Sequence, residues 1–236
     1  MNDHELERAI AHDAARAIDE YGRRAADGGI GAYYQRIAQA MARAQRRRRD
    51  RLAELLIACG DPRTMRVIDV GCGDGSDIEH LTRSGWSEHL MAGVEIFEPS
   101  LERARRRLPH ANLMIANAAQ LPFPDESFDA AVQFTVLSSI VDPRVRLAAV
   151  GEMFRVTRSG GLVISWDMKS GGRNSNLAGI DRDEIRRLFA PHSGSVTVER
   201  AWLSLPVASR VSPWVAGMLE RLPFALDHYV AHCRKQ

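Results

Sequence analysis

The stretch Val67-Ile68-Asp69-Val70-Gly71-Cys72-Gly73-Asp74-Gly75-Ser76-Asp77 decides the fold of this chain. Its apolar run breaks into alternating glycines and acids, a pattern that predicts a buried strand, a tight turn and a helix start. Glycine in such a turn permits positive φ values and lets a ligand approach the backbone, while the helix start offers unpaired N–H groups. The stretch therefore predicts a pocket for a nucleotide-like ligand.

Two features of this turn indicate which nucleotide it binds. The dinucleotide fingerprint requires glycine or alanine three residues after its second glycine, and Ser76 stands there. Acidic residues also crowd the predicted mouth, and they would repel a pyrophosphate: Asp69, Asp74, Asp77 and Glu79. S-adenosylmethionine carries a sulfonium, an ammonium and an adenosine but no phosphate, so it is the expected ligand.

Length and composition set the limits of the architecture. With 236 residues, 45% of them hydrophobic, and a formal charge of +2, the chain is long enough for one core with an appendage and has no strong bias toward nucleic acid. Cys59, Cys72 and Cys233 show no paired spacing, so neither a disulfide nor a metal site is expected. No apolar run approaches the ~18 residues of a membrane span, and the first 20 residues lack an apolar leader. We therefore expect a cytoplasmic protein without a membrane span.

Two amphipathic helices are predicted before the glycine turn. The first extends to Gly28-Gly29 and the second to Cys59-Gly60, each with apolar residues at three- and four-residue steps. We predict that residues 1–60 form a helical cap or lid over a ligand-binding core at 61–236. Tyr33 and Tyr34 could close over the ligands and contact the acceptor, with simple packing as the alternative.

Strand and helix patterns alternate after the turn. Helices are predicted at 99–108 and 143–158, the latter with Asp142 as its N-cap, and strands at 90–95, 112–116, 128–134 and 162–166. Short connections between alternating strands and helices are typical of a doubly wound α/β fold with a mostly parallel sheet.

Polar residues that follow the second and third strands complete the predicted cofactor pocket. Glu95 ends a strand about 20 residues after the glycines, where a carboxylate can accept both ribose hydroxyls, so Glu95→Ala should abolish cofactor affinity and leave the fold intact. Ile96 follows it. Asn117 can accept from the adenine amino group while the backbone of Ala118 faces a ring nitrogen.

In these motifs the sequence resembles the class I S-adenosylmethionine-dependent methyltransferases of the methyltransferase type 11 kind. The resemblance extends over about residues 64–170 and rests on elements in matching order: 67–75, Glu95, 117–123, 128–140, and the E-x-x-R-V-x-x-x-G-G pattern from Glu152. It implies a Rossmann-like sheet of seven strands with an antiparallel last strand. The sixth and seventh strands are expected at 195–202 and 226–233. It also implies cofactor contacts at Asp69, Gly71, Cys72, Gly73, Asp74, Phe134 and Thr135, and no metal.

The acceptor side is less constrained. Asp167 ends the fifth predicted strand and is our first candidate to orient or deprotonate an acceptor hydroxyl, with Ser139, Asn174 and Asn176 as further acceptor contacts. The resemblance implies methyl transfer to a small molecule or a glycan, with oxygen favoured. Many relatives have Asp at the position of Asn117 and a His pair at Ser138-Ser139, so a general base there is not implied.

Three other functions are compatible with parts of the sequence. A binding or regulatory protein could keep the fold without turnover. A nucleic-acid methyltransferase is suggested by the four arginines at 46–49 alone, and such runs are more often solvated or paired with acids such as Asp50 and Glu54. A nicotinamide oxidoreductase is opposed by Ser76 and the acids. The N-terminal helices also permit a homodimer.

Overall fold

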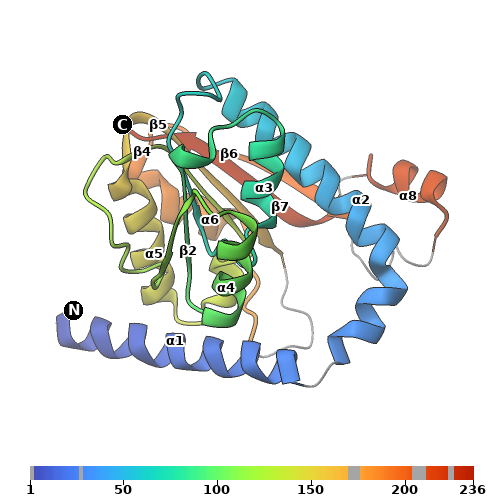
Figure 1. Cartoon of the computed structure of the whole chain (residues 1–236), viewed down its shortest axis with the longest axis horizontal. Helices are drawn as coiled ribbons and strands as arrows, with labels where there is room; N and C mark the ends of the chain where they lie inside the picture. The colour runs from blue at the N-terminus through green and yellow to red at the C-terminus, as the bar shows by residue number, and fades with distance from the viewer. Residues whose placement is uncertain (1–2, 27–28, 170–175, 204–210, 223–225) are drawn as a thin grey trace.

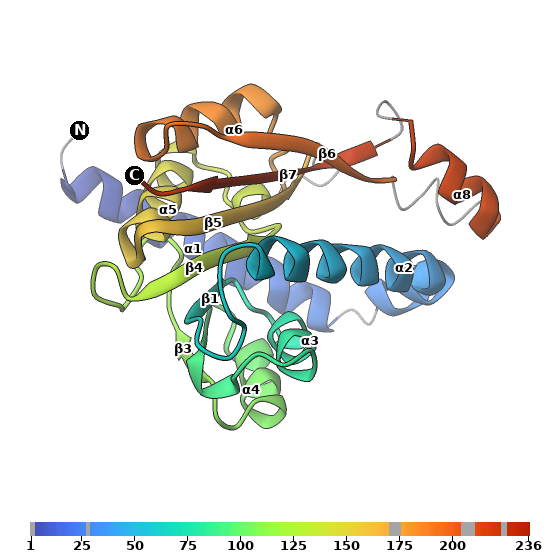
Figure 2. The ribbon, with the colours of Figure 1, turned by 90° about the horizontal axis from the view of Figure 1, so that it is seen from above.

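The computed structural model describes residues 3–26, 29–169, 176–203, 211–222 and 226–236, with the backbone alone at 29–41, 202, 203 and 213. Seven strands form one sheet in the order β3-β2-β1-β4-β5-β7-β6. Helices cover both of its faces (Figures 1 and 2). The strands are β1 (Val67–Val70), β2 (Met91–Glu95), β3 (Asn112–Ile115), β4 (Phe128–Phe134), β5 (Thr157–Met168), β6 (Thr197–Leu203) and β7 (Leu226–Arg234). The helices are α1 (Asp3–Ala26), α2 (Gly29–Ile57), α3 (Ser76–Arg83), α4 (Glu98–Arg107), α5 (Pro143–Val156), α6 (Arg182–Phe189) and α8 (Pro213–Leu219).

Successive side chains of each strand point to opposite faces of the sheet, so the interior is divided into two cores. In β1, Ile68 and Val70 join a core with α1, α5 and α6, whereas Val67 joins a core with α2, α3 and α4. Figure 2 shows α5 and α6 on one side of the sheet and α2, α3 and α4 on the other. Because both faces of the central strands are covered, their sequences are nearly continuous apolar runs.

The predicted strand directions are confirmed. β1, β2, β3, β4 and β5 pair in parallel, and β7 runs antiparallel between β5 and β6. The doubly wound, mostly parallel sheet of seven strands with an antiparallel last strand is the fold expected from the sequence.

Several predicted boundaries differ from the observed ones. The helix predicted at 143–158 ends at Val156, because Thr157 already begins β5, and the segment after β4 turns into a short 3-10 helix at Leu137–Ser139. Asp142 is the N-cap of α5, as predicted, and its side chain accepts from the Arg144 N–H at 2.8 Å. Helix α6 was not predicted, although Asp181 followed by Glu184 is a capping signature.

The two N-terminal helices contribute to both cores. Ile10 of α1 is buried in the core beneath α5, and Leu52 and Leu56 of α2 are fully buried in the other. Figure 1 shows α1 lying across the end of the sheet where the parallel strands terminate. No described helix combines the length and apolar character needed to cross a membrane.

Candidate functional site

A cavity of about 220 Å³ lies between α1 and the carboxyl ends of the parallel strands. Open parallel sheets bind ligands at this edge. Its walls come from five parts of the chain: α1, the β1–α3 turn, and the segments that follow β2, β3 and β4. Predicted cofactor residues that line it are Gly71, Gly73, Glu95, Ile96, Asn117, Ala118, Phe134 and Thr135.

The glycine turn forms the floor of this cavity. Gly71 has φ +76°, and a Cβ there would lie 2.2 Å from Cγ2 of Val136. Gly73 has φ +55°, but a Cβ there would meet no atom within 4 Å. Gly71 is therefore required by the protein itself, whereas Gly73 keeps space open that a ligand can occupy.

Glu95 organises the rim of the turn. Its Oε2 accepts from the Gly73 N–H at 3.0 Å, and its Oε1 accepts from the N–H groups of Ile96 and Phe97 at 2.8 and 2.9 Å. Burial raises the pKa of this carboxyl, while the three N–H donors act in the opposite direction. Glu95 lines the cavity, so the same carboxylate that fixes the turn also faces a bound ligand.

The loop after β3 is clamped by the E-x-x-R motif of α5. Arg155 donates to the carbonyls of Leu121 and Phe123 at 3.0 and 2.8 Å, and Glu152 accepts from the Leu121 N–H at 2.6 Å. In this loop Oδ1 of Asn117 accepts from the Ala119 N–H at 2.9 Å, which closes an Asx turn. A carbonyl oxygen has two lone pairs, so Asn117 keeps one for a ligand.

The segment after β4 is held in a rarely populated conformation. Thr135 has φ +59°, which is unusual for a β-branched residue, and its carbonyl accepts from the hydroxyls of Ser138 and Ser139 at 3.2 and 2.8 Å. Such a conformation persists when surrounding contacts over-determine it, and it occurs most often at functional sites. Here it brings Thr135 and Ser139 to the cavity wall.

Asp167 lies beneath this segment and not in the cavity wall. It is completely buried, accepts from the Ser138 N–H at 2.9 Å and from the Ser165 hydroxyl at 2.8 Å, and also bonds the Gln133 amide. In this arrangement Asp167 fixes the turn that carries Ser139, and it is not among the residues that line the cavity.

Helix α1 supplies cavity residues that were not predicted from the sequence. Tyr21 and Asp13 line the cavity. A side-chain hydrogen bond joins Tyr21 to Ser139, and burial raises the pKa of its phenol, so at neutral pH it remains protonated. Oδ1 of Asp13 accepts from the Val141 N–H at 3.1 Å. The sequence signal for Tyr21 was the three- and four-residue spacing of the first predicted helix, and Asp13 is not part of that pattern.

Asn176 secures α1 to the loop after β5. Its Nδ2 donates to Glu20 at 2.9 Å, and its backbone carbonyl accepts from the Arg16 guanidinium at 3.1 Å. Asn176 therefore contacts α1 beside the cavity. Of the other predicted acceptor contacts, Asn174 and the side chains of Tyr33 and Tyr34 lie outside the described residues.

The acids of the glycine turn do not line the cavity as predicted. Asp77 forms ion pairs with Arg48 and Arg49, Asp74 pairs with Arg107 at 3.2 Å, and Glu79 pairs with Arg107 at 2.6 Å. Ion pairing neutralises these acids, so they do not create the acidic mouth inferred from the sequence. Cys72 packs against Gly93 and is also absent from the cavity wall.

The arginine run of α2 has long-range partners. Arg47 pairs with Glu220, and the Arg48 guanidinium lies 4.1 Å from the ring centroid of Phe134. Three of the four arginines, Arg47, Arg48 and Arg49, pair with acids, and their partners are Glu220 and Asp77 instead of Asp50 and Glu54. The Arg48 contact joins α2 to a residue of the cavity wall, and the Arg47 pair joins α2 to the end of α8.

The residues present fit S-adenosylmethionine. Asp69 is buried beneath the turn, and its Oδ1 has no hydrogen-bond partner among the described residues. Burial raises the pKa of Asp69 well above its usual value, with the Asp77 carboxylate adding to the effect and Arg48 opposing it. The cavity wall itself carries the Glu95 carboxyl beside the open glycine turn, a combination that suits a ligand with hydroxyl groups better than a phosphate. The described residues contain no cluster of three or more His, Cys, Asp or Glu side chains that could hold a metal ion.

Comparison with known proteins agrees with this geometry. Residues 68–165 match the family model described as a methyltransferase domain. The chain is 32% identical over 119 residues to 27-O-demethylrifamycin SV methyltransferase of Amycolatopsis mediterranei, an alignment that covers 48% of this chain and 40% of that protein. The chain spans less than half of the length of the curated relatives it matches.

Solved structures extend the similarity over almost the whole chain at the level of fold. Magnesium protoporphyrin IX methyltransferase of Synechocystis PCC 6803, solved with bound SAM, has a TM-score of 0.64 at 13% identity and covers 95% of this chain and 97% of its own. The [4+2]-cyclase SpnF has a TM-score of 0.54 at 20% identity and covers 79% of this chain and 81% of its own. The fold is therefore shared by a methyltransferase and a cyclase.

Proposed function

We propose that this chain, whose residues 68–165 match a methyltransferase domain, transfers a methyl group from S-adenosylmethionine to a small-molecule acceptor. The observation that carries the proposal is the cavity beneath α1, where Glu95, Gly73 and Asn117 meet from three strand ends. Each of these residues is suited to a different part of the cofactor.

The ribose and adenine ends are assigned to Glu95 and to the loop after β3. Glu95 offers a carboxylate to the ribose hydroxyls, with each charged hydrogen bond contributing about 1.5–3 kcal/mol. The free lone pair of Asn117 would accept from the adenine amino group, and the clamp by Arg155 holds the loop in place. The glycine turn at Gly71 and Gly73, beneath which Asp69 is buried, would hold the amino-acid end of the cofactor.

Methyl transfer to oxygen is an in-line displacement in which the sulfonium supplies the leaving group, and the acceptor loses a proton. The task of the protein is chiefly to align acceptor and methyl group, which lowers a barrier by on the order of 7–11 kcal/mol. Ser139 and the protonated Tyr21 phenol line the cavity and can donate to or accept from an acceptor hydroxyl. Asp167 positions Ser139 through the Ser138 backbone.

We propose a small hydroxylated acceptor, in preference to a glycan, because α1 closes the cavity on one side. The 27-O-demethylrifamycin relative is consistent with oxygen as the methylated atom. Tyr33, Tyr34 and Asn174 remain proposed acceptor contacts. Residues 1–60 act in this proposal as the lid, with Asp13, Arg16 and Glu20 fastening it by polar bonds that can break and re-form.

The experiment is a turnover assay with S-adenosylmethionine and a panel of phenols, alcohols, amines and carboxylic acids, in which S-adenosylhomocysteine release is measured. We expect release to depend on a hydroxylated acceptor. Binding of the cofactor without release for any acceptor would favour a non-methylating role of this fold, as the SpnF similarity allows.

A further inference from the structure

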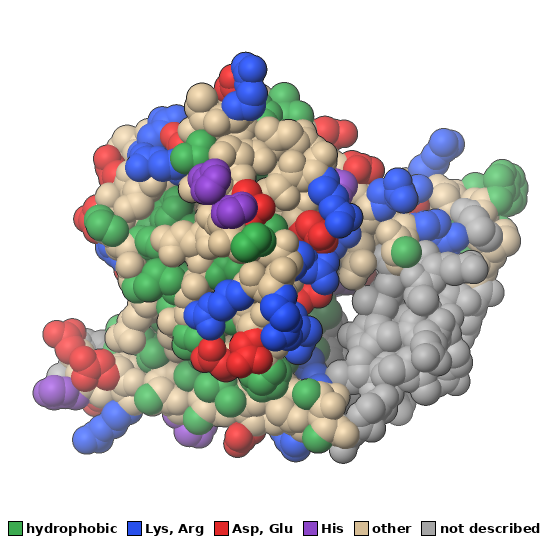
Figure 3. Space-filling model, viewed as in Figure 1, with side chains coloured by type: hydrophobic (Ala, Val, Ile, Leu, Met, Phe, Trp, Pro, Cys, Tyr) green, Lys and Arg blue, Asp and Glu red, His purple; other side chains and the backbone are tan. Residues whose placement is uncertain are grey.

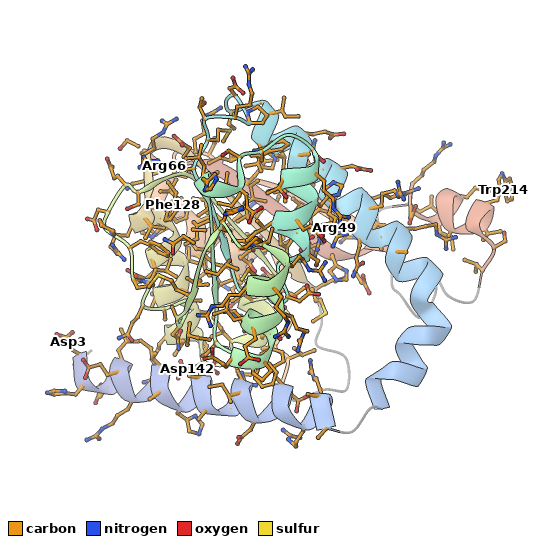
Figure 4. All side chains as sticks on the ribbon, in the orientation of Figure 1. Asp3, Arg49, Arg66, Phe128, Asp142 and Trp214 are labelled. Carbon is orange, nitrogen blue, oxygen red and sulfur yellow. The ribbon has the colours of Figure 1, made fainter. Side chains whose placement is uncertain are left out.

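Helix α8 presents apolar side chains to solvent at the edge of the molecule. Trp214 is 74% exposed and Met218 51% exposed, and their four-residue spacing places them on one side of the helix. Leu222, just beyond the helix end, is 39% exposed. Figure 4 shows Trp214 at the outer tip of α8, directed away from the sheet. Ala216 is buried, so the opposite side of the helix is anchored.

Cationic side chains flank this apolar tip. The ion pair between Arg47 and Glu220 brings the middle of α2 beside the end of α8. Arg46 precedes Arg47 and Arg221 follows Glu220 in the sequence; both are exposed, and neither is within ion-pair distance of a carboxylate in the described parts of the chain. Figure 3 shows Lys and Arg side chains along this side of the molecule. We call Trp214, Met218, Leu222, Arg46 and Arg221 the α8 surface.

From this combination we propose that the α8 surface docks onto an anionic lipid bilayer. Trp214 and Met218 enter the interfacial region, and Arg46 and Arg221 contact lipid phosphates. Tryptophan and cationic side chains are the residues that locate peripheral proteins at the headgroup level of anionic membranes. The proposal goes beyond the methyl-transfer function and does not depend on it.

The shape and size of the α8 surface favour a bilayer over a protein partner. A stable protein interface buries about 800 Å² on each side and has a well-packed apolar centre. Three exposed apolar side chains on and beside a seven-residue helix supply much less, and they form a projecting tip instead of a groove. A projecting tip requires a matching pocket in a protein, whereas a fluid bilayer accepts it.

Vesicle co-sedimentation of the full chain tests this proposal. We expect binding to vesicles of phosphatidylcholine mixed with phosphatidylglycerol, weak binding to phosphatidylcholine alone, and loss of binding at high salt. The double variant Trp214→Ser/Met218→Ser should lose binding to anionic vesicles, and neutralising Arg46→Gln or Arg221→Gln should weaken it by about fivefold each. Titration with S-adenosylhomocysteine and circular dichroism confirm that each variant is folded.

Matched controls lie elsewhere on the surface. Leu147→Ser removes a 49% exposed leucine from α5, and Arg106→Gln removes an exposed arginine from α4; both should bind vesicles like the wild type. Equal binding of wild type and the Trp214→Ser/Met218→Ser variant would overturn the proposal. A second result would also overturn it: the wild type binds no vesicles and forms a dimer by light scattering, and the Trp214→Ser/Met218→Ser variant is monomeric. The α8 surface would then be an interface between two copies.

Discussion

Replacing Glu95 with glutamine tests the cofactor site with little change of shape. The carboxylate accepts three backbone N–H bonds, from Gly73, Ile96 and Phe97, and an amide nitrogen cannot accept. In Glu95→Gln one of these buried N–H groups loses its partner, which costs about 1–3 kcal/mol of unfolding free energy. Burial raises the pKa of Glu95, so removal of the charge offsets part of this cost. We expect a net loss near the lower figure.

The effect of Glu95→Gln on cofactor binding should be larger. One ribose hydroxyl loses a charged acceptor that contributes about 1.5–3 kcal/mol, which corresponds to a roughly 10- to 150-fold lower affinity. Calorimetric titration with S-adenosylhomocysteine measures it, with urea unfolding in parallel. Glu98→Gln is the matched control, because Glu98 is exposed and its one ion-pair partner among the described residues is the surface residue Arg105. If Glu95→Gln bound the product as tightly as the wild type, the ribose assignment would be refuted. Glu95→Ala should also destabilise the turn, contrary to our expectation from sequence that the fold would be unaffected.

Three further predictions concern the same site. Gly71→Ala should impair folding, because the added Cβ clashes with Val136. Gly73→Ala should fold, at a cost of about 1 kcal/mol for its positive φ, and lose cofactor binding. Thermal unfolding and calorimetric titration distinguish the two outcomes. Asp69→Asn should stabilise the free protein and weaken cofactor binding. Burial holds the pKa of Asp69 above its unfolded value of 3.8, so the charged form destabilises the folded wild type at high pH. The stability advantage of asparagine should therefore be greatest at alkaline pH and vanish as the pH falls toward 3.8. Arg155→Ala should lower unfolding free energy by about 2–3 kcal/mol and weaken cofactor binding through the loop it clamps, with no rescue by Arg155→Lys, since lysine lacks the planar fork.

Features encoded by local sequence could be predicted, and features that depend on distant segments could not. The glycine turn, the acid at the end of β2 and the Asp142 cap follow from the residues within a few positions of each. The cavity contacts of Tyr21 depend instead on how α1 crosses the strand ends, which no local pattern specifies. The same reason explains Asp77, whose partners Arg48 and Arg49 lie almost 30 residues away.

Asp167 illustrates a different limit. Its position at a strand end was correctly inferred, but a strand end has two faces, and the sequence does not show which polar side chains are satisfied internally. In the structure Gln133, Ser165 and the Ser138 N–H use its oxygen atoms. A polar residue at the carboxyl end of a parallel strand can therefore support the site from below instead of contacting the ligand.

Hydrogen–deuterium exchange with and without S-adenosylmethionine tests the central claim most directly, because it maps the binding site without requiring the acceptor. We predict slower exchange at 71–77, 95–100, 116–120 and 134–140, and in α1 around 13–21, with no change in α6. Absence of protection at these segments, or protection confined to another part of the chain, would contradict the assignment of the cavity beneath α1 as the cofactor site.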